Sequence, residues 1–512
     1  MIRDHIQAGP PAGELTAELK AADWWTDQAV AAAGIPVRDV PFVSVGGGMG
    51  SFATVDYLRI AGMPKSGIRV LTNLNQPWQT YEYLTRVSQI PRAERIRSDS
   101  ASRPDNIWGF PSYALQEAVS CRTVAPLWQV LVEPLFADFY TPRLGMVLRG
   151  VEREARRIGY WDMVVHGEVR MVRRRAGGGY FTVLTPKPGT SSARRIAFRS
   201  RDVHVAVGYP GLKFLPDLQR FRLEHRDFFH VMNAYEDHEH IYTTLRHRPG
   251  TVVVRGGGIV ASRILERLIR DRDRYALQTQ IVHLFRSYVD GAHGPHPWSR
   301  RRGGHGFAYQ GFNYPKSVWG GQLKARMRRL DGEQRAKAYD AMGGTTTAYR
   351  RSWQRQLAEG RRAGWYRTIT GTIEQLRPRR PAPMLVQLRT AEGPVEVPAD
   401  FVIDCTGLEA DVSEHRVLGD LLAHGGAGRN PLGRLEVERS FELRGAASGD
   451  GRLYVSGAAA LGGYFPGVDT FLGLQIAAQE IADDLARRGA CRRIGTARSI
   501  TQWLMWMSDR EI

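Results

Sequence analysis

A glycine cluster near the amino terminus has the composition and spacing to hold the pyrophosphate of a dinucleotide. In the segment VGGGMGS, Gly46, Gly48 and Ser51 occupy the three positions of the G-x-G-x-x-G/A pattern, with Gly47 and Gly50 between them. The first position permits a sharp turn, the second lets backbone amides approach a phosphate, and the third is a small residue where a helix packs on a strand. The phosphate is then expected at the helix amino terminus, where unpaired amides favour negative charge.

The strand expected after this helix lacks the carboxylate that usually binds the adenosine ribose. Its sequence, IRVLTNLNQ, offers only Thr72, Asn73 or Asn75 for that hydrogen bond. We therefore expect one of these three side chains to contact the ribose.

A second cluster repeats the pattern in the middle of the chain. In VRGGGIVAS, Gly256, Gly258 and Ala261 fill the same three positions. The next strand ends at Arg286 and Ser287 rather than at a carboxylate. Arg286 can pair bidentately with a 2′-phosphate and Ser287 can donate to it, so the second site is predicted to bind NADPH.

Each glycine cluster must be positioned by a strand before it and a helix after it. The apolar spacing predicts strand 42–45, helix 51–61 and strand 68–74 around the first cluster, and strand 251–254, helix 259–269 and strand 280–285 around the second. An antiparallel hairpin over 161–184 is expected to lie on the first sheet. Strands at 203–207, 401–403 and 452–455 and a helix from 470 to 486 complete the pattern. The fold class is therefore α/β, with two nested Rossmann-like domains and a helical insertion.

These elements suggest a division of the chain into segments. We expect an N-terminal extension over 1–40, a discontinuous first dinucleotide domain over 41–215 and 377–490, a second over 216–376 that includes a helical substrate region, and a C-terminal tail over 491–512.

Composition limits the possible partners. The chain of 512 residues has no apolar run long enough to span a membrane and no secretory signal, and its three cysteines are far apart, so a cytoplasmic protein is expected. His293, His296 and His305 lack the spacing of a zinc site, so no metal is expected. The net charge of +19 is interpreted as an arginine-rich surface because no RNA- or DNA-binding motif accompanies it, which makes nucleic acid an improbable partner.

The order of these motifs resembles that of flavoproteins with two dinucleotide-binding domains. Within them it is similar to the single-component (class B type) FAD- and NADPH-dependent monooxygenases, and in layout to the amine N-hydroxylating enzymes. The segments AVGYP (206–210) and DCTG (404–407) resemble the two strands that link the domains in that family. The segment RLYVSGAAALGGYFPGVDTFLGLQIAA resembles the family's terminal FAD motif.

The resemblance implies the cofactors FAD and NADPH and assigns further residues to the site. Gly407 and Gly457 would lie close to FAD, and Asp469, Thr470 and Phe471 would face the pyrimidine edge of the flavin. Candidate substrate-side residues are His230, Asn233, Tyr235, Asn313, Tyr314 and Lys316.

The implied reaction is oxygenation of a small-molecule substrate, which the charge suggests is acidic. In the family, NADPH reduces FAD, and a C4a-(hydro)peroxyflavin formed with dioxygen transfers one oxygen atom, in some members to an amine nitrogen. Two alternatives stay open: a reductase that passes electrons to a quinone or a protein, and a nucleic-acid-associated flavoprotein. The sequence carries no indication of the oligomeric state.

Overall fold

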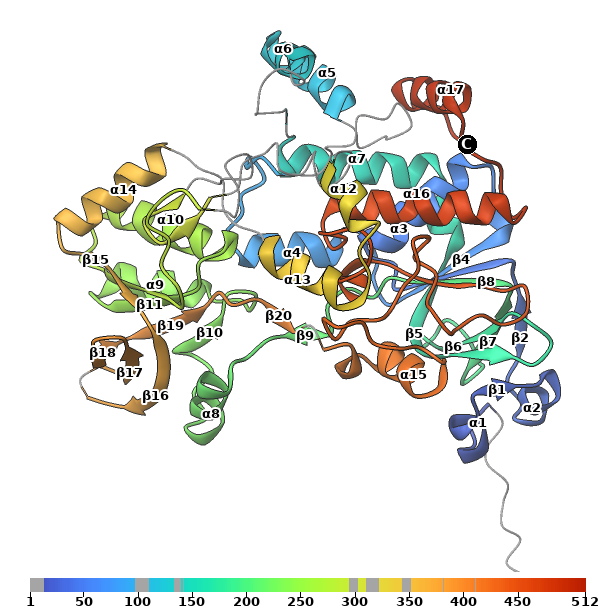
Figure 1. Ribbon diagram of the computed structural model, residues 1–512, viewed down its shortest axis with the longest axis horizontal. Helices are drawn as coiled ribbons and strands as arrows, with labels where there is room; N and C mark the ends of the chain where they lie inside the picture. The colour runs from blue at the N-terminus through green and yellow to red at the C-terminus, as the bar shows by residue number, and fades with distance from the viewer. Residues whose placement is uncertain are drawn as a thin grey trace, which may run out of the picture.

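The computed structural model describes most of the chain in two lobes (Figure 1). The described residues are 13–96, 110–132, 140, 142–293, 303–309, 322–342, 351–380, 382–409 and 411–512.

The first lobe is built on a nine-stranded sheet whose centre is parallel. Its order is β2 (Val37–Asp39), β7 (Ile196–Ser200), β6 (Tyr180–Pro186), β5 (Val164–Arg175), β4 (Ile68–Thr72), β3 (Phe42–Val45), β8 (Asp202–Val205) and β21 (Leu453–Val455), and β1 (Trp24–Trp25) also pairs with β5. The predicted hairpin is β5–β6. Since β5 pairs with β4 in parallel, the hairpin extends this sheet rather than covering its face.

Three long helices lie on one side of this sheet. They are α3 (Met49–Ile60), α7 (Leu144–Arg157) and α16 (Phe471–Arg487). Every residue of α3 is buried, because the helix lies between the sheet and its neighbours and packs along α16. The apolar residues of α3 and of strands β3, β4, β8 and β21 form one continuous core.

The second lobe contains a five-stranded parallel sheet. Its order is β10 (Val231–Asn233), β19 (Phe401–Asp404), β11 (Thr251–Arg255), β12 (Gln280–Phe285) and β15 (Tyr366–Thr370). Helices α9 (Glu239–His247), α10 (Ile259–Tyr275) and α14 (Arg351–Arg362) lie above the sheet in Figure 1. The antiparallel sheet of β16 (Thr372–Pro378), β17 (Met384–Thr390) and β18 (Gly393–Ala399) and helix α8 (Pro216–Glu224) share a core with its other face.

The return to the first lobe therefore differs from the predicted boundary at residue 377. Strands β16 to β19 belong to the second lobe, since β19 pairs with both β10 and β11. The chain crosses between the lobes in two segments, one at β9 (Gly211–Leu212) and one at β20 (Leu408–Glu409). These two crossings lie side by side, because β9 pairs with β20. The boundary was misplaced because the sequence does not show which sheet an added strand joins.

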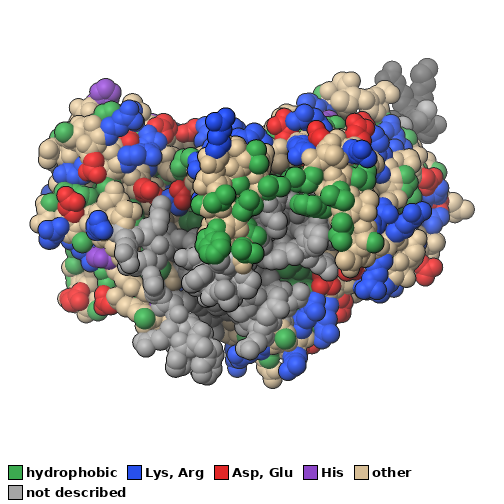
Figure 2. Space-filling model, turned by 90° about the horizontal axis from the view of Figure 1, so that it is seen from above, with side chains coloured by type: hydrophobic (Ala, Val, Ile, Leu, Met, Phe, Trp, Pro, Cys, Tyr) green, Lys and Arg blue, Asp and Glu red, His purple; other side chains and the backbone are tan. Residues whose placement is uncertain are grey.

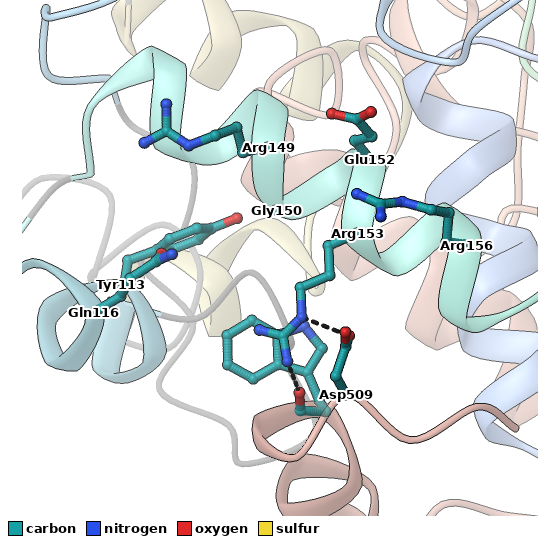
Figure 3. A pocket seen from close by; sticks show the side chains of 9 residues that line it. Tyr113, Gln116, Arg149, Gly150, Glu152, Arg153, Arg156 and Asp509 are labelled. Atoms are coloured by element: carbon teal, nitrogen blue, oxygen red, sulfur yellow. Dashed lines mark hydrogen bonds and ion pairs between the residues drawn. The ribbon is translucent and has the colours of Figure 1, made fainter. Parts of the chain in front are cut away.

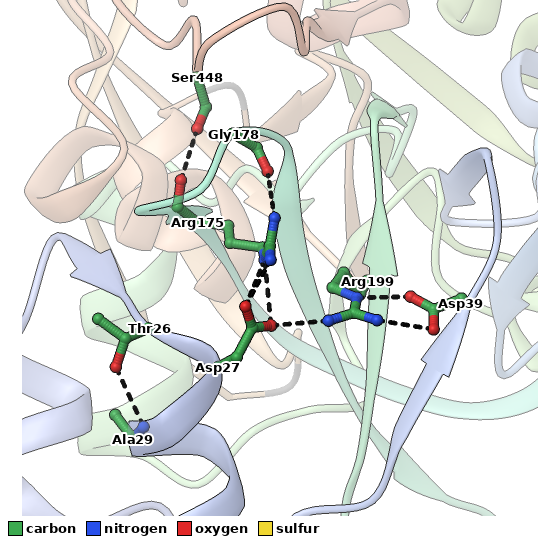
Figure 4. Close-up of polar contacts among 8 residues, drawn as sticks. All are labelled: Thr26, Asp27, Ala29, Asp39, Arg175, Gly178, Arg199 and Ser448. Atoms are coloured by element: carbon green, nitrogen blue, oxygen red, sulfur yellow. Dashed lines mark hydrogen bonds and ion pairs between the residues drawn. The ribbon is translucent and has the colours of Figure 1, made fainter.

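The predicted N-terminal extension is not separate from the first lobe. Helices α1 (Ala17–Ala21) and α2 (Asp27–Ala32) flank Trp25, which is buried against the sheet. Asp27 binds both Arg175 and Arg199, and Arg199 also binds Asp39 (Figure 4). These hydrogen bonds, first those from Arg175, lower the pKa of Asp27.

The remaining helices pack around the lobes. They are α4 (Gln79–Val87), α5 (Phe110–Cys121), α6 (Ala125–Val132), α12 (Gln322–Met327), α13 (Gly332–Met342), α15 (Arg416–His424) and α17 (Thr496–Met507). The insertion helices α12 and α13 dock on the first lobe: Arg328 at the end of α12 pairs with Glu480 at 2.7 Å, and the Tyr339 hydroxyl donates to the Gly463 carbonyl at 2.8 Å. Within the described ranges, every helix is too short or too polar to cross a bilayer.

Candidate functional site: two glycine turns and the crossings between the lobes

The first glycine turn joins β3 to α3 with the geometry that the sequence predicts. Gly46 has φ +122° and Gly47 φ +66°, values that favour glycine. A Cβ at Gly46 would lie 2.2 Å from the Ala206 carbonyl oxygen, so the turn rests directly on the end of β8. At Gly48, by contrast, the nearest atom to an added Cβ would be Leu74 Cδ1 at 3.9 Å, which leaves this position open for a close approach by a ligand.

The third position of the pattern, Ser51, stabilises the turn through a side-chain hydrogen bond. Its hydroxyl is buried and accepts a hydrogen bond from the Gly47 amide at 3.1 Å. Gly50, on the same helix, faces Ala206 and Leu474, because its Cβ would lie 3.0 Å and 3.3 Å from them. The glycine at this position therefore lets α3 pack against the start of α16.

Of the three candidates for the ribose, Thr72 is already engaged. Its hydroxyl donates to the Gly46 carbonyl at 2.9 Å and accepts from the Leu74 amide at 3.0 Å. The side chain thus braces the glycine turn, whereas Asn73 and Asn75 are exposed at the end of β4. Sequence reasoning could not distinguish these roles, because the partner of Thr72 is distant in the chain.

The C-terminal motif brings a helix amino terminus to the same end of the sheet. Thr470 caps α16 by accepting from the Gly473 amide, and Phe471 packs edge-on against Tyr81 at 4.4 Å between ring centres. Asp469 accepts a 2.6 Å hydrogen bond from the Tyr209 hydroxyl. Gly457, with φ +76°, begins the short turn after β21.

Tyr81 and Tyr209 were not among the predicted site residues. Burial raises the pKa of both, and for Tyr209 the Asp469 carboxylate raises it further. Tyr209 lies in the AVGYP segment, which resembles a strand that links the domains. That resemblance was the sequence signal that could have placed Tyr209 near the site.

The second glycine turn joins β11 to α10. Gly256 has φ +130°, and its Cβ would lie 3.0 Å from the Cys405 carbonyl oxygen at the end of β19. Gly258 is the N-cap residue of α10, and Ala261 in the first turn of that helix is fully buried. Both glycine turns therefore lie at the carboxyl ends of parallel strands, where open α/β sheets bind ligands.

The residues predicted to select NADPH lie at the next strand end. Arg286 and Ser287 follow β12 directly and are exposed. Among the described residues, Arg286 has no ion-pair partner, so its guanidinium can bind a phosphate. The turn at 303–309 packs beside it, since a Cβ at Gly306 would lie 2.4 Å from the Phe285 ring.

Arg255, the last residue of β11, forms an ion pair next to the second glycine turn. It pairs with Asp217 at 2.8 Å, and both side chains are largely buried. Asp404, its neighbour across the sheet, is fully buried and accepts hydrogen bonds from the amide and hydroxyl of Thr406. Burial raises the pKa of Asp404 to about 6.

Asn233 joins the two lobe crossings rather than facing a substrate. Its amide nitrogen donates to the carbonyls of Lys213 at 2.8 Å and Gly407 at 3.4 Å, and its oxygen accepts from the Tyr235 amide. Gly407 has φ +116°, and a Cβ there would meet open space. The Asn233 side chain is buried and fully engaged, so the geometry gives it a positioning role.

His230 lies at the opposite end of β10 from the glycine turns. Its Nδ1 contacts Asp227 at 2.9 Å and its ring stacks on Phe401. The catalytic role expected for His230 therefore lacks geometric support, because ligands bind at the other end of the strands. The local sequence did not show where β10 begins.

Tyr235, in contrast, follows β10 at the end of the sheet where the glycine turns lie, near Cys405 of the second lobe and Asp469 of the first. Burial, followed by the nearby Cys405 and Asp469, raises its pKa to about 12. Its hydroxyl therefore stays protonated at neutral pH and can donate a hydrogen bond. The other candidates, Asn313, Tyr314 and Lys316, lie outside the described residues.

A cavity on another part of the surface is separate from both turns. It has a volume of about 260 Å³ and lies between α5, α7 and α17 (Figure 3). Arg149, Arg153 and Arg156 of α7 line it, and Arg153 is held by Asp509 at 2.7 Å. In the part of the chain that the structure describes, no three His, Cys, Asp or Glu side chains are grouped as metal ligands.

Comparison with known proteins identifies the fold. No family model and no curated protein matches the sequence. Among solved structures, the chain is similar to the ornithine N-hydroxylase of Kutzneria sp. 744 with reduced FAD, NADP+ and L-ornithine, at 14% identity, over 88% of this chain and 100% of that one, with a TM-score of 0.62. It is also similar to the FAD-bound cadaverine monooxygenase of Erwinia amylovora, at 11% identity, over 90% and 97% of the chains, with a TM-score of 0.64.

The same fold also occurs in a protein named for another activity. Bacillithiol disulfide reductase of Bacillus cereus matches at 13% identity over 88% of this chain and 100% of that one, with a TM-score of 0.52. The comparisons thus confirm the predicted fold class of two nested Rossmann-like domains. At these identities the likeness shows the fold alone.

Proposed function

We propose that this chain is a monooxygenase that uses FAD, NADPH and dioxygen to add one oxygen atom to a small molecule, with a primary amine nitrogen as the preferred acceptor. The observation that supports this best is the pair of glycine turns in a fold shared over about nine-tenths of the chain with amine-oxidising flavoproteins. Fold likeness alone does not fix an activity, so the proposal depends on the site residues as well.

The first lobe would hold FAD through its two glycine-rich turns and two helix amino termini. Gly46 to Gly48 and the first amides of α3 would bind the pyrophosphate, and Asn73 or Asn75 the ribose. The amino terminus of α16, with Asp469, Thr470 and Phe471, would hold the pyrimidine edge of the ring. When bound, FAD supplies the hydride acceptance and the oxygen activation.

The second lobe would hold NADPH in the same way. Gly256, Gly258 and the start of α10 would bind its pyrophosphate, and Ala261 keeps the helix close to the strand. Arg286 and Ser287 would contact the 2′-phosphate. Tyr235 and Gly407 lie where the second lobe faces the first, so they would contact the reacting ends of the ligands and help to exclude water.

The substrate is proposed to be a primary amine because the similar ornithine and cadaverine enzymes are named for amines. An acidic small molecule, which the net charge of +19 favours, is the competing expectation. Asn313 and Lys316 remain proposed substrate-side residues. A cytoplasmic location, where NADPH is available, is proposed with the enzyme.

The test is oxygen incorporation. Purified protein loaded with FAD would be given NADPH, isotopically labelled dioxygen and a panel of ornithine, lysine, cadaverine and their carboxylated or acetylated analogues. We expect one labelled oxygen atom in an amine product, found by mass spectrometry, with NADPH consumed in equal amount. If NADPH were oxidised with reduction of a quinone or a disulfide, and no amine of the panel gave a labelled product, the protein would instead be a reductase.

A further inference from the structure

Each glycine turn is held by a buried histidine on the neighbouring strand. His204 of β8 and His283 of β12 are both fully buried. Strands β3 and β11 lead into the two glycine turns. His204 pairs with Ser44 of β3, and His283 pairs with Val254 of β11, so each histidine lies on the strand beside a glycine turn. Neither histidine belongs to the glycine pattern from which the sites were predicted.

His283 contacts its turn directly. Its Nε2 lies 2.6 Å from the Gly256 carbonyl oxygen, and its Nδ1 lies 2.9 Å from the Tyr366 hydroxyl on β15. Because a carbonyl only accepts, Nε2 must carry the proton, and Nδ1 then accepts from Tyr366. Three adjacent parallel strands are thereby linked, and the Gly256 peptide has one fixed orientation.

His204 contacts its turn through two serines. Its Nδ1 lies 3.2 Å from the Ser44 hydroxyl, which lies 2.8 Å from the Ser51 hydroxyl, and Ser51 accepts from the Gly47 amide. On its other side, Nε2 lies 2.8 Å from the hydroxyl of Ser456, the residue before Gly457. His204 therefore connects the turn proposed to hold the pyrophosphate with the turn proposed to lie near the flavin.

Both histidines are neutral at physiological pH. Burial lowers the pKa of each to about 3. A neutral imidazole has one donor and one acceptor nitrogen, so it can join two groups across a core with no buried charge. This explains why the two positions take histidine: an apolar residue would remove the imidazole that contacts the Gly256 carbonyl in one lobe and the Ser44 and Ser456 hydroxyls in the other.

We propose that His204 and His283 are positioning residues, each of which fixes the glycine turn of one dinucleotide site, His204 for FAD and His283 for NADPH. The inference rests on the proposed function for the identity of the two ligands. The observed hydrogen bonds predict that each histidine affects one cofactor and leaves the other unchanged.

The experiment is a crossed binding measurement on the full chain. FAD affinity is measured by fluorescence titration of the apoprotein, and NADP+ affinity by calorimetry of the FAD-loaded protein. We expect His283→Leu to raise the Kd for NADP+ at least about tenfold and to change the Kd for FAD less than about twofold. His204→Leu should raise the Kd for FAD at least about tenfold, with NADP+ binding unchanged once FAD is saturating.

His238→Leu is the matched control. His238 is also buried, and its ring also contacts a carbonyl and a tyrosine hydroxyl, those of Glu236 and Tyr242, but neither of these two partners belongs to a glycine turn. We expect this variant to leave the affinities for both cofactors unchanged. His283→Gln, which can still donate to the Gly256 carbonyl, should recover part of the NADP+ affinity.

Milder variants test the same bonds if a leucine variant does not fold. Tyr366→Phe removes the hydroxyl that His283 contacts, and Ser456→Ala removes one of the two hydroxyls that His204 contacts. The first should weaken NADP+ binding alone and the second FAD binding alone. Equal affinities in the variants and the parent protein, or parallel loss of both cofactors, would overturn the positioning roles. A parent protein that binds neither cofactor would instead overturn the proposed function.

Discussion

At the scale of single residues, Gly46 and Gly48 of the first turn differ in what a side chain would meet. Gly46 has a left-handed φ and contacts the end of β8, so Gly46→Ala forces a methyl group into the Ala206 carbonyl. Gly48 has room for a methyl group in the protein itself and is required only if a ligand approaches it. The two substitutions therefore separate folding from cofactor binding.

We expect Gly46→Ala to destabilise the first lobe by about 2 kcal/mol or more, since strain and overlap add. Gly48→Ala should unfold at the same temperature as the parent apoprotein yet bind FAD at least about tenfold more weakly. Thermal unfolding and FAD titration measure the two effects. Gly428→Ala, with no atom within 4 Å of the added carbon, is the control. Normal FAD affinity in Gly48→Ala would contradict a pyrophosphate at this turn.

Arg286 is expected to determine the choice of nicotinamide cofactor. Its exposed guanidinium at the end of β12 can form a charge-assisted, bidentate contact with a 2′-phosphate, which NADH lacks. Arg286→Ala should reduce the preference for NADPH over NADH about tenfold or more, through weaker NADPH binding with NADH unchanged. The ratio of kcat/KM for flavin reduction measures it. Arg270→Ala, an exposed arginine on α10, should leave that ratio as it is.

At the scale of elements, the end of β19 contains an acid whose charge state is coupled to stability. Burial raises the pKa of Asp404 to about 6, above its ordinary value of 3.8. The folded protein therefore holds this proton more tightly than the unfolded chain does. The resulting stabilisation is complete below about pH 4 and is lost as the pH rises through 6.

Asp404→Asn should remove this pH dependence, because its amide remains neutral. Relative to the variant, the parent protein should lose about 2 kcal/mol of its free energy of unfolding between about pH 4.5 and about pH 7.5. Urea unfolding of both proteins at the two pH values gives the difference, in which the other titrating groups cancel. A constant difference across this range would show that Asp404 is ionised throughout.

Elements with a strong local pattern were predictable, and their neighbours in space were not. The sequence correctly predicted the strands and helices around both glycine turns because apolar spacing and glycine act locally. It did not show that β19 joins the second sheet, or that Thr72 and Asn233 bond to distant backbone. Those facts depend on pairings between segments tens to hundreds of residues apart, which a single sequence does not encode visibly.

At the scale of the whole molecule, many of the positive charges are paired with carboxylates or backbone carbonyls. Figure 2 shows basic and acidic side chains mixed on one face, around apolar side chains near its centre. Many arginines bind carboxylates, as Arg199 and Arg222 do, or backbone carbonyls, as Arg272 does. Such arginines stabilise the fold locally, which is consistent with an arginine-rich surface rather than a track for a polyanion.

The relative position of the two lobes depends on contacts made by α10, the helix that begins at the second glycine turn. Arg263 on this helix pairs with Glu94 of the first lobe at 2.7 Å, and its side chain is only 7% exposed. Arg267, one turn later, donates to the side-chain oxygen of Gln89 at 2.9 Å. One helix thus both holds the proposed NADPH site and sets its distance from the proposed flavin.

Arg263→Leu should therefore slow electron transfer between cofactors without preventing either from binding. We expect the rate of flavin reduction at saturating NADPH to fall about tenfold. This corresponds to an activation free energy about 1.4 kcal/mol higher, because the two cofactors are less well aligned. Rapid-mixing absorbance measures this rate, and titrations establish that both Kd values are retained. Arg487→Leu breaks an exposed pair within α16 and should leave the rate unchanged. If Arg263→Leu also left the rate unchanged, the lobes would be aligned by other contacts between them, such as that of Arg267 with Gln89 and the pairing of β9 with β20.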